Sequence, residues 1–363
     1  MRTLESLSLC CLIVAQLAGC QTSPAPAGTG LLVEPADAMR LGYTIGPVTD
    51  LGIPIDQKLE HAVILDQFLI TVESPSNLIT AVSLDDGSVV WRQVIGGKAH
   101  RLFKPMMFEG QILVNSESDI YLLNADTGQP IEQQPLEAHV SHHPGMLGSL
   151  AIFGSVEGLV FAHDLRTGYS KWRRQMSGNV LASPVVYRND VFVGDGNGQC
   201  AMRSAISGQF LWPARTFGAI VAPPAINRAA IFLACNDQSL YALNRDDGRD
   251  RWIYRAGRPL RHRPIVIRNT LFLRLTGKGL QAIDTSNGKE KWFFASDVRP
   301  ITTVKDRLLV HNPEELLMVD LESGKATKQI PIQRLHKVIP IESKRLLLIS
   351  PRGQVLRLDP REG

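Results

Sequence analysis

Residues 239–252 read SLYALNRDDGRDRW, an alternating apolar run followed by an Asp-Asp-Gly turn and a tryptophan four residues after the glycine. The combination is typical of a β-hairpin, because glycine readily adopts the positive φ that a tight turn requires. Glycines in similar surroundings recur along the chain, at Gly87, Gly128, Gly168, Gly208, Gly248, Gly288 and Gly324. Successive positions lie 41, 40, 40, 40, 40 and 36 residues apart, so the hairpin belongs to a repeat of about forty residues.

The tryptophans follow the same repeat. All five lie four residues after one of these glycines, at Trp91, Trp172, Trp212, Trp252 and Trp292. Each unit also contains four short apolar or alternating runs separated by turn signals, which is the pattern of a β-propeller blade. We expect each tryptophan ring to pack between adjacent blades. An Asp or Asn shortly before the glycine, such as Asn244, is expected to accept N–H groups of the turn.

The number of units predicts the closure of the ring. Gly363 is an eighth glycine in the series, and its unit contains three runs without a fourth. Residues 41–51, LGYTIGPVTDL, precede the first unit and have no place within one. We therefore predict an all-β, eight-bladed β-propeller of four-stranded antiparallel blades over residues 41–363. In it, the N-terminal strand completes the last blade and leaves no open edge there.

The first twenty residues, MRTLESLSLCCLIVAQLAGC, contain an apolar run that is too short to span a bilayer and fits a signal peptide. The ending resembles a bacterial lipoprotein signal, in which residues 1–19 are removed and Cys20 carries lipid. An ordinary secretory signal ending in cysteine is the alternative. Residues 20–40 then form the lipidated cysteine and a Pro/Ala/Gly-rich flexible tether. Gln21 resembles the pattern sorted to the outer membrane, which implies its periplasmic face.

Composition excludes some classes of function. The net charge of +4 over 363 residues is only mildly basic, whereas a nucleic-acid-binding protein would have a denser basic surface. Apart from the signal and the lipidated Cys20, the remaining cysteines are Cys200 and Cys235. They could pair in an oxidising compartment, but their different positions within the repeat favour two separate buried thiols.

The unit, with a run ending in Asp or Asn, then Thr, Ser, Asp or Asn before Gly and three residues before Trp, resembles the quinoprotein-type repeat of pyrroloquinoline quinone (PQQ) dehydrogenases. With the lipoprotein signal and the short tether, the chain is similar to the BamB family, scaffold lipoproteins of the machinery that inserts β-barrel proteins into the outer membrane. The resemblance implies a non-catalytic, monomeric propeller, anchored to the membrane by lipid, whose partners are envelope proteins, including the β-barrel insertase. That family contacts its partner through a Leu-x-Leu-Arg element, but residues 176–181 here read MSGNVL.

Two alternatives remain. One is a stand-alone propeller of the same repeat that binds another envelope protein or a small anionic ligand. The other is a degenerate quinoprotein enzyme. Such enzymes place a vicinal disulfide beside the quinone, whereas the vicinal pair here, Cys10 and Cys11, belongs to the signal. We therefore expect no catalytic residue, no PQQ and no metal. Adjacent residues such as His142 and His143 would point to opposite faces of a strand, which does not favour a metal site.

A set of basic residues has the same position in six of the eight units, just before the innermost strand, and no unit has an acid there. These residues are His61, Lys104, His142, His143, His262, Arg263, Arg299 and Lys337. In a propeller these positions would converge around one mouth of the central channel, where clustered cations attract anions. We predict a site for acidic peptide segments or a small anion. The alternative is that polar loops lie here in an Arg-rich part of the chain.

Overall fold

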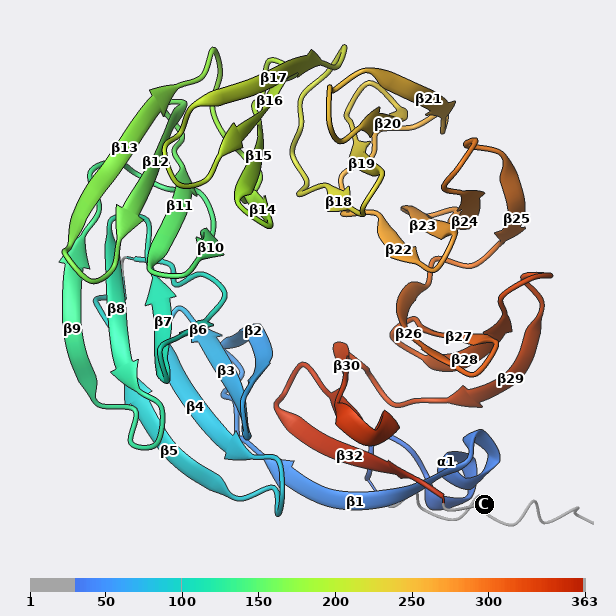
Figure 1. Cartoon of the computed structure of the whole chain (residues 1–363). Coiled ribbons are helices and arrows are strands. Elements are labelled where there is room, and N and C mark those ends of the chain that lie inside the picture. The colour runs from blue at the N-terminus through green and yellow to red at the C-terminus, as the bar shows by residue number, and fades with distance from the viewer. Residues whose placement is uncertain (1–29, 99, 362–363) are drawn as a thin grey trace, which may run out of the picture. The chain divides into compact units, whose positions relative to one another are not determined.

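In a computed structural model of the protein, residues 30–98 and 100–361 are described, and they form eight four-stranded antiparallel sheets. The sheets stand around a ring, with one strand of each facing the centre (Figure 1). This arrangement confirms the predicted eight-bladed propeller. In seven of these blades the strands follow the chain order from the innermost strand outward (Figure 1).

The first four blades contain sixteen strands. Blade 1 comprises β2 (Lys58–Leu65), β3 (Phe68–Ser74), β4 (Leu78–Ser83) and β5 (Val89–Val94). Blade 2 comprises β6 (Met106–Phe108), β7 (Gln111–Asn115), β8 (Asp119–Asn124) and β9 (Pro130–Pro135). Blade 3 comprises β10 (Gly145–Leu147), β11 (Leu150–Gly154), β12 (Leu159–Asp164) and β13 (Tyr169–Gln175). Blade 4 comprises β14 (Val185–Tyr187), β15 (Asp190–Gly194), β16 (Gln199–Ser204) and β17 (Phe210–Arg215).

The other four blades follow the same order until the last. Blade 5 comprises β18 (Ala225–Ile226), β19 (Ala230–Ala234), β20 (Ser239–Asn244) and β21 (Asp250–Arg255). Blade 6 comprises β22 (Ile265–Ile267), β23 (Thr270–Leu275), β24 (Gly279–Asp284) and β25 (Glu290–Phe294). Blade 7 comprises β26 (Arg299–Val304), β27 (Arg307–His311), β28 (Glu315–Asp320) and β29 (Ala326–Pro331). Blade 8 comprises β30 (Lys337–Pro340), β31 (Leu346–Ile349), β32 (Gln354–Pro360) and β1 (Tyr43–Asp50), with the 3-10 turn η1 (Glu342–Lys344) between β30 and β31.

Blade 8 is completed by the N-terminal strand. β1 pairs antiparallel with β32, from Tyr43 opposite Pro360 to Asp50 opposite Gln354. Figure 1 shows the blue first strand beside the red end of the chain. This pairing confirms that residues 41–51 supply the outer strand that the last unit lacks.

Burial follows the position of a strand within its blade. Every residue of β11 is buried, because the two faces of a middle strand are both covered by neighbouring blades. In β13, by contrast, the outermost strand, Trp172 is the one fully buried residue, in an alternating pattern of exposure. The apolar runs of the sequence therefore correspond to the middle strands, and the alternating runs correspond to the outer ones.

The tryptophans pack between blades as expected. Each indole N–H donates a hydrogen bond of 2.8–3.1 Å to a main-chain oxygen of the next blade; the acceptors are Ala125, Ala205, Arg245, Thr285 and Leu321. Each ring also lies against the repeat glycine of that blade, where a Cβ would come within 2.3–2.7 Å of an indole carbon. The glycines have φ of +68° to +77°. Both the turn and the close approach therefore require glycine.

Two interfaces without tryptophan use another donor for the equivalent carbonyl, three residues before the repeat glycine. Between blades 2 and 3, the Gln134 side chain donates to the Leu165 oxygen (2.8 Å), and its own oxygen lies 2.8 Å from Nε2 of His163. Between blades 8 and 1, the Arg357 guanidinium donates to the Leu84 oxygen (2.7 Å). The repeat pattern did not predict these donors, because Gln134 has another position in the outer strand β9 and Arg357 belongs to β32, the third strand of its blade.

All but the last residue of the helix α1 (Pro35–Leu41) lie within residues 20–40, which the sequence assigned to a tether. Leu32, Val33, Ala38 and Leu41 are buried in one cluster with residues of blades 7 and 8. The compact unit accordingly begins at Leu31. The expected signal peptide and Cys20 lie outside the described residues. Within them, no helix has the length and apolar character needed to cross a membrane.

Candidate functional site: a cation cluster at the channel mouth

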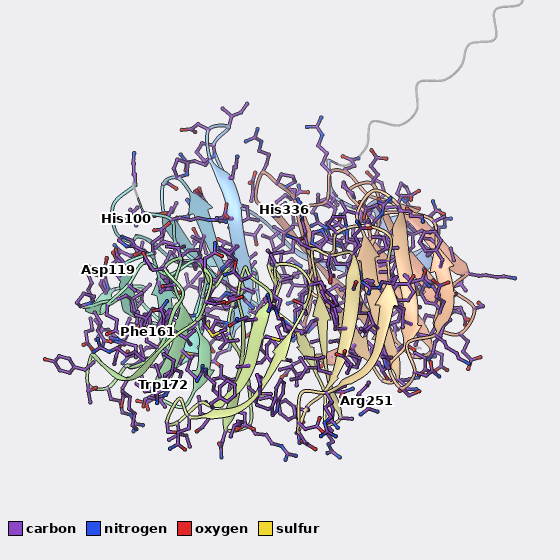
Figure 2. All side chains as sticks on the ribbon, turned by 90° about the horizontal axis from the view of Figure 1, so that it is seen from above. His100, Asp119, Phe161, Trp172, Arg251 and His336 are labelled. Atoms are coloured by element: carbon purple, nitrogen blue, oxygen red, sulfur yellow. The ribbon has the colours of Figure 1, made fainter. Side chains whose placement is uncertain are left out.

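The predicted basic residues lie where the chain enters the innermost strand in five blades, whereas in blade 1 His61 lies inside β2, which begins earlier than the sequence indicated. His61 is in β2, Arg299 and Lys337 begin β26 and β30, and the others precede β6, β10 and β22, as follows: Lys104, His142, His143, His262 and Arg263. The loops that lead into these strands share one face of the ring. Figure 2 shows His100 and His336 toward that face, with Trp172 and Arg251 toward the opposite one.

Four of these side chains carry charge into the same region, and we call Lys104, Arg263, Arg299 and Lys337 the cation cluster. Burial, and then the charge of Arg263, lower the pKa of Lys104. These two residues come from blades 2 and 6, which lie opposite each other across the ring (Figure 1). Burial and the charge of Lys104 lower the pKa of Lys337 to about 8. The structure therefore brings like charges together across the channel.

The histidines of the predicted set are neutral at pH 7. Burial is the largest of the causes that together lower the pKa of His61 and of His143 to about 4, and the charges of neighbouring cations are among the others. Burial also lowers the pKa of His142 and of His262 below the ordinary value. The eight predicted basic residues thus comprise four charges and four neutral imidazoles.

The neutral side chains are held by local hydrogen bonds. His143 Nδ1 lies 3.0 Å from the Ser183 hydroxyl of the next blade, and His262 Nε2 lies 3.0 Å from the Thr276 hydroxyl. Among the cations, Lys337 Nζ donates to the Ala62 carbonyl oxygen at 2.6 Å, which joins blade 8 to blade 1. His143, His262 and Lys337 are therefore held in place before any ligand arrives.

The other three cations have no such partner. Lys104, Arg263 and Arg299 are exposed, and within residues 30–98 and 100–361 no hydrogen bond or ion pair forms on their side chains. Burial nevertheless lowers the pKa of all three, because they face a channel surrounded by protein. Their charge is therefore available to a molecule that enters the channel.

Two acids near the cation cluster, Glu60 and Asp297, form ion pairs with other arginines. Glu60 forms an ion pair with Arg101. Asp297 accepts from Arg274 at 2.7 Å and also from the Gly277 N–H at 3.0 Å. The arginine lowers the pKa of this carboxyl, so Asp297 is ionised and paired. Each acid thus has a cationic partner, although the charge of Asp297 also acts on Arg299 and favours its protonated form.

A cavity of about 1000 Å³ lies along the innermost strands β2, β6 and β30. Lys104 and Lys337 are part of its lining, together with apolar side chains such as Val63 and Ile339. Toward the other end of these strands the lining also contains Asp66, Asp85, Glu342 and Arg345. The cation cluster thus borders a space large enough for a small molecule.

The position of a residue within the repeat does not predict two further residues of this region, because they belong to middle strands. His311 ends β27, and burial followed by the charge of Arg299 lowers its pKa to about 4. Arg274 in β23 holds Asp297. Only their spatial position beside Arg299 reveals them, since middle-strand residues have no loop position in the repeat.

The two cysteines and the glycine-rich stretch have structural roles. Cys200 and Cys235 are unpaired and buried, and burial raises the pKa of Cys200 to about 12, so this thiol is protonated and inert. The glycine-rich stretch around Asp195 is the turn between β15 and β16, where the carboxylate accepts from the N–H groups of Asn197 and Gln199. In the described part of the chain, no group of three His, Cys, Asp or Glu residues could hold a metal.

Comparison with known proteins identifies the family. The family model described as "Outer membrane protein assembly factor BamB" matches residues 75–219 and 208–350. A curated protein of that name from Legionella pneumophila (strain Paris) is 29% identical over 123 residues, which cover 33% of this chain. The match spans only 31% of that relative, about a third of its length.

Solved structures show the same fold. BamB from Moraxella catarrhalis has a TM-score of 0.69 at 15% identity, over 87% of this chain and 98% of the other. The computationally designed Ika8 protein also has a TM-score of 0.69, at 12% identity, over 85% of this chain and 98% of the other. These structures establish the fold alone. Because the family model covers most of the blades, the chain belongs to the family of the outer membrane protein assembly factor BamB.

Proposed function

We propose that this protein is a non-catalytic, lipid-anchored scaffold that takes part in the assembly of outer-membrane β-barrel proteins. The observation that carries the proposal is the family match, which extends from residue 75 to residue 350. Its partners are envelope proteins, and the β-barrel insertase is the first candidate. Cys20 carries the lipid, and the propeller lies at the periplasmic face of the outer membrane.

The loop face is the surface on which we place the partner. Connecting loops vary while blades are constrained by packing, so a propeller binds through its loops. Phe217, in the loop between β17 and β18, has an exposed fraction of 85%. An exposed aromatic side chain is a frequent anchor of protein interfaces.

Site-specific cross-linking in intact cells tests this function. A photoreactive residue at Phe217 is compared with one at Tyr169, which is 78% exposed and directly follows the repeat glycine on the opposite face. We expect Phe217 to form a cross-link to the β-barrel insertase, identified by mass spectrometry, and Tyr169 to form none.

Recovery of a different envelope protein at Phe217 would contradict the assembly role and support the stand-alone propeller. A Cys20→Ser variant examines the anchor separately. We expect it to leave the membrane fraction while its propeller still melts as the wild type does. A variant that remains in the membrane fraction would contradict lipidation at Cys20.

A further inference from the structure

We propose that the cation cluster binds a compact multivalent oxyanion, a ligand whose closely spaced oxygens belong to phosphate or carboxylate groups. Lys104, Arg263 and Lys337 are its charge partners, and Arg299 lies beside them. The cluster lies at the channel mouth, on the same face of the ring as the loop that carries Phe217. The inference does not rest on a role in β-barrel assembly.

The first support is convergence. Lys104 and Arg263 come from opposite blades, yet the charge of one influences the other, so both reach toward the channel axis. Lys104 also acts on Lys337, and both Arg299 and Lys337 act on His336. A ligand at the axis would therefore meet cations from several sides, as a multivalent anion requires.

The second support is uncompensated charge. Like charges that lie close together in a confined space repel each other, and water screens them less than on an open surface. The two nearby acids, Glu60 and Asp297, are paired with Arg101 and Arg274. A bound anion would relieve this repulsion, whereas a cation or a neutral molecule would not.

The third support is a prearranged set of polar groups. Lys337 is tied to the Ala62 oxygen at 2.6 Å, so less conformational entropy is lost when it binds. His61 Nε2 is buried, and no hydrogen-bond partner for it exists in the part of the chain that the structure describes. A buried polar atom without a partner is unfavourable, and an oxygen of the ligand could accept from the N–H tautomer of this ring.

The fourth support is space. Lys104 and Lys337 border the cavity of about 1000 Å³ that continues along β2, β6 and β30. At the opposite part of the ring, blades 4 and 5 have the uncharged residues Ser183 and Pro223 before their innermost strands. The cavity volume is sufficient for a small ligand with more than one anionic group.

Isothermal titration calorimetry on the full-length protein in detergent, at low salt, tests the site with two probes. One probe is inorganic pyrophosphate, and the other is a capped hexa-aspartate peptide. Binding of pyrophosphate identifies phosphate oxygens as the ligand chemistry, and preferential binding of the peptide identifies clustered carboxylates. If neither probe binds the wild-type protein, the inference is wrong.

The variant Lys104→Gln/Arg263→Gln is compared with Arg249→Gln/Lys289→Gln, which removes the same charge from turns on the opposite face. Because charge-assisted hydrogen bonds are lost, we expect the first variant to bind at least about tenfold more weakly and the second to bind as the wild type. An equal loss of affinity in both variants would mean that net charge attracts the probe without a specific site, and it would contradict the proposal.

A check on folding accompanies the titration. Removing two like charges should not lower the thermal midpoint of the Lys104→Gln/Arg263→Gln variant. The single variant Lys337→Gln provides an independent second measurement, and we expect it to weaken binding as well. If Lys337→Gln and the double variant both bind like the wild type, the cation cluster is not the binding site.

Discussion

Gly248 shows how tightly a single residue is constrained. Its φ is +74°, and a Cβ built there would lie 2.4 Å from the Trp212 ring. Gly110 has nearly the same φ, +78°, but no atom lies within 4 Å of its Cβ position. The pair separates the effect of backbone conformation from the effect of crowding.

We expect Gly248→Ala to lower the free energy of unfolding more than Gly110→Ala does. Both variants carry the left-handed backbone penalty of about 1–2 kcal/mol. Gly248→Ala adds an overpacking penalty of about 1–3 kcal/mol, because the methyl group displaces the indole ring. Urea unfolding of the two variants measures the difference. Equal losses would mean that the contact between tryptophan and glycine contributes no constraint of its own.

The buried histidines make stability depend on acid pH. His61, His143 and His311 have a pKa of about 4 in the folded protein, against about 6.5 in an unfolded chain. Between these values the unfolded state binds more protons, so the free energy of unfolding rises with pH. The stability is complete above about pH 6.5 and is lost as the pH falls toward 4.

Urea unfolding between pH 7 and pH 4.5 checks this dependence. The triple variant with glutamine at the three positions should lose less stability over that range than the wild type does. His139→Gln, which changes an exposed histidine, is the control and should retain the wild-type dependence. If the stability of the triple variant depended on pH as the wild type does, these three histidines would not be the cause of the dependence. The carboxyl of Asp297, whose pKa is lowered, titrates below this range.

At the scale of elements, β1 is the least replaceable strand. It covers β32, whose Leu356 and Leu358 are buried in the cluster shared with α1. Without β1, the N–H and C=O groups of β32 would form an open edge that promotes association between chains. Both the loss of buried apolar surface and the open edge are expected to destabilise blade 8.

Removal of residues 31–50 should therefore lower the thermal midpoint and cause self-association, measured by calorimetry and sedimentation velocity. A chain that begins at Gly30 retains α1 and β1 and serves as the control. If the shorter chain is a monomer with the midpoint of the control, the N-terminal strand does not contribute to the closure of the ring.

The elements also show what the sequence could predict. The glycine and tryptophan spacing is sufficient to predict the blades and the role of β1, because each blade must satisfy the same turn and the same interface. Gln134 and Arg357 replace the indole donor from other positions, so spacing does not reveal them. Helix α1 was missed because its Pro and Ala residues resemble a linker, although Leu32 and Val33 just before it are buried.

The site was predicted in part for a related reason. Loop position placed Lys104, Arg263, Arg299 and Lys337 at one mouth, since every unit enters its innermost strand at the same face. The protonation of His61 and His143 depends on burial, which a sequence does not contain. His311 was missed because a middle strand brings it to the site from another part of the repeat.

At the scale of the whole molecule, the ring combines local blades with one distant pairing. Each blade from the first to the seventh is made of consecutive strands, so its contacts are close in sequence. Blade 8 instead joins β1 to β32, and the Thr44 hydroxyl donates to the Asp359 oxygen 315 residues away. Contacts between such distant residues form slowly, because a long loop must close first.

This pairing sets an order of events during synthesis on the ribosome. Strand β1 emerges first but has no partner until nearly the whole chain has been translated. Seven blades can form in the meantime and pack into a curved stack, while β1 stays unpaired at one end of it. We expect the unpaired strand β1 to be the part of the nascent chain that most needs a chaperone. We also expect the ring to close in a single late step.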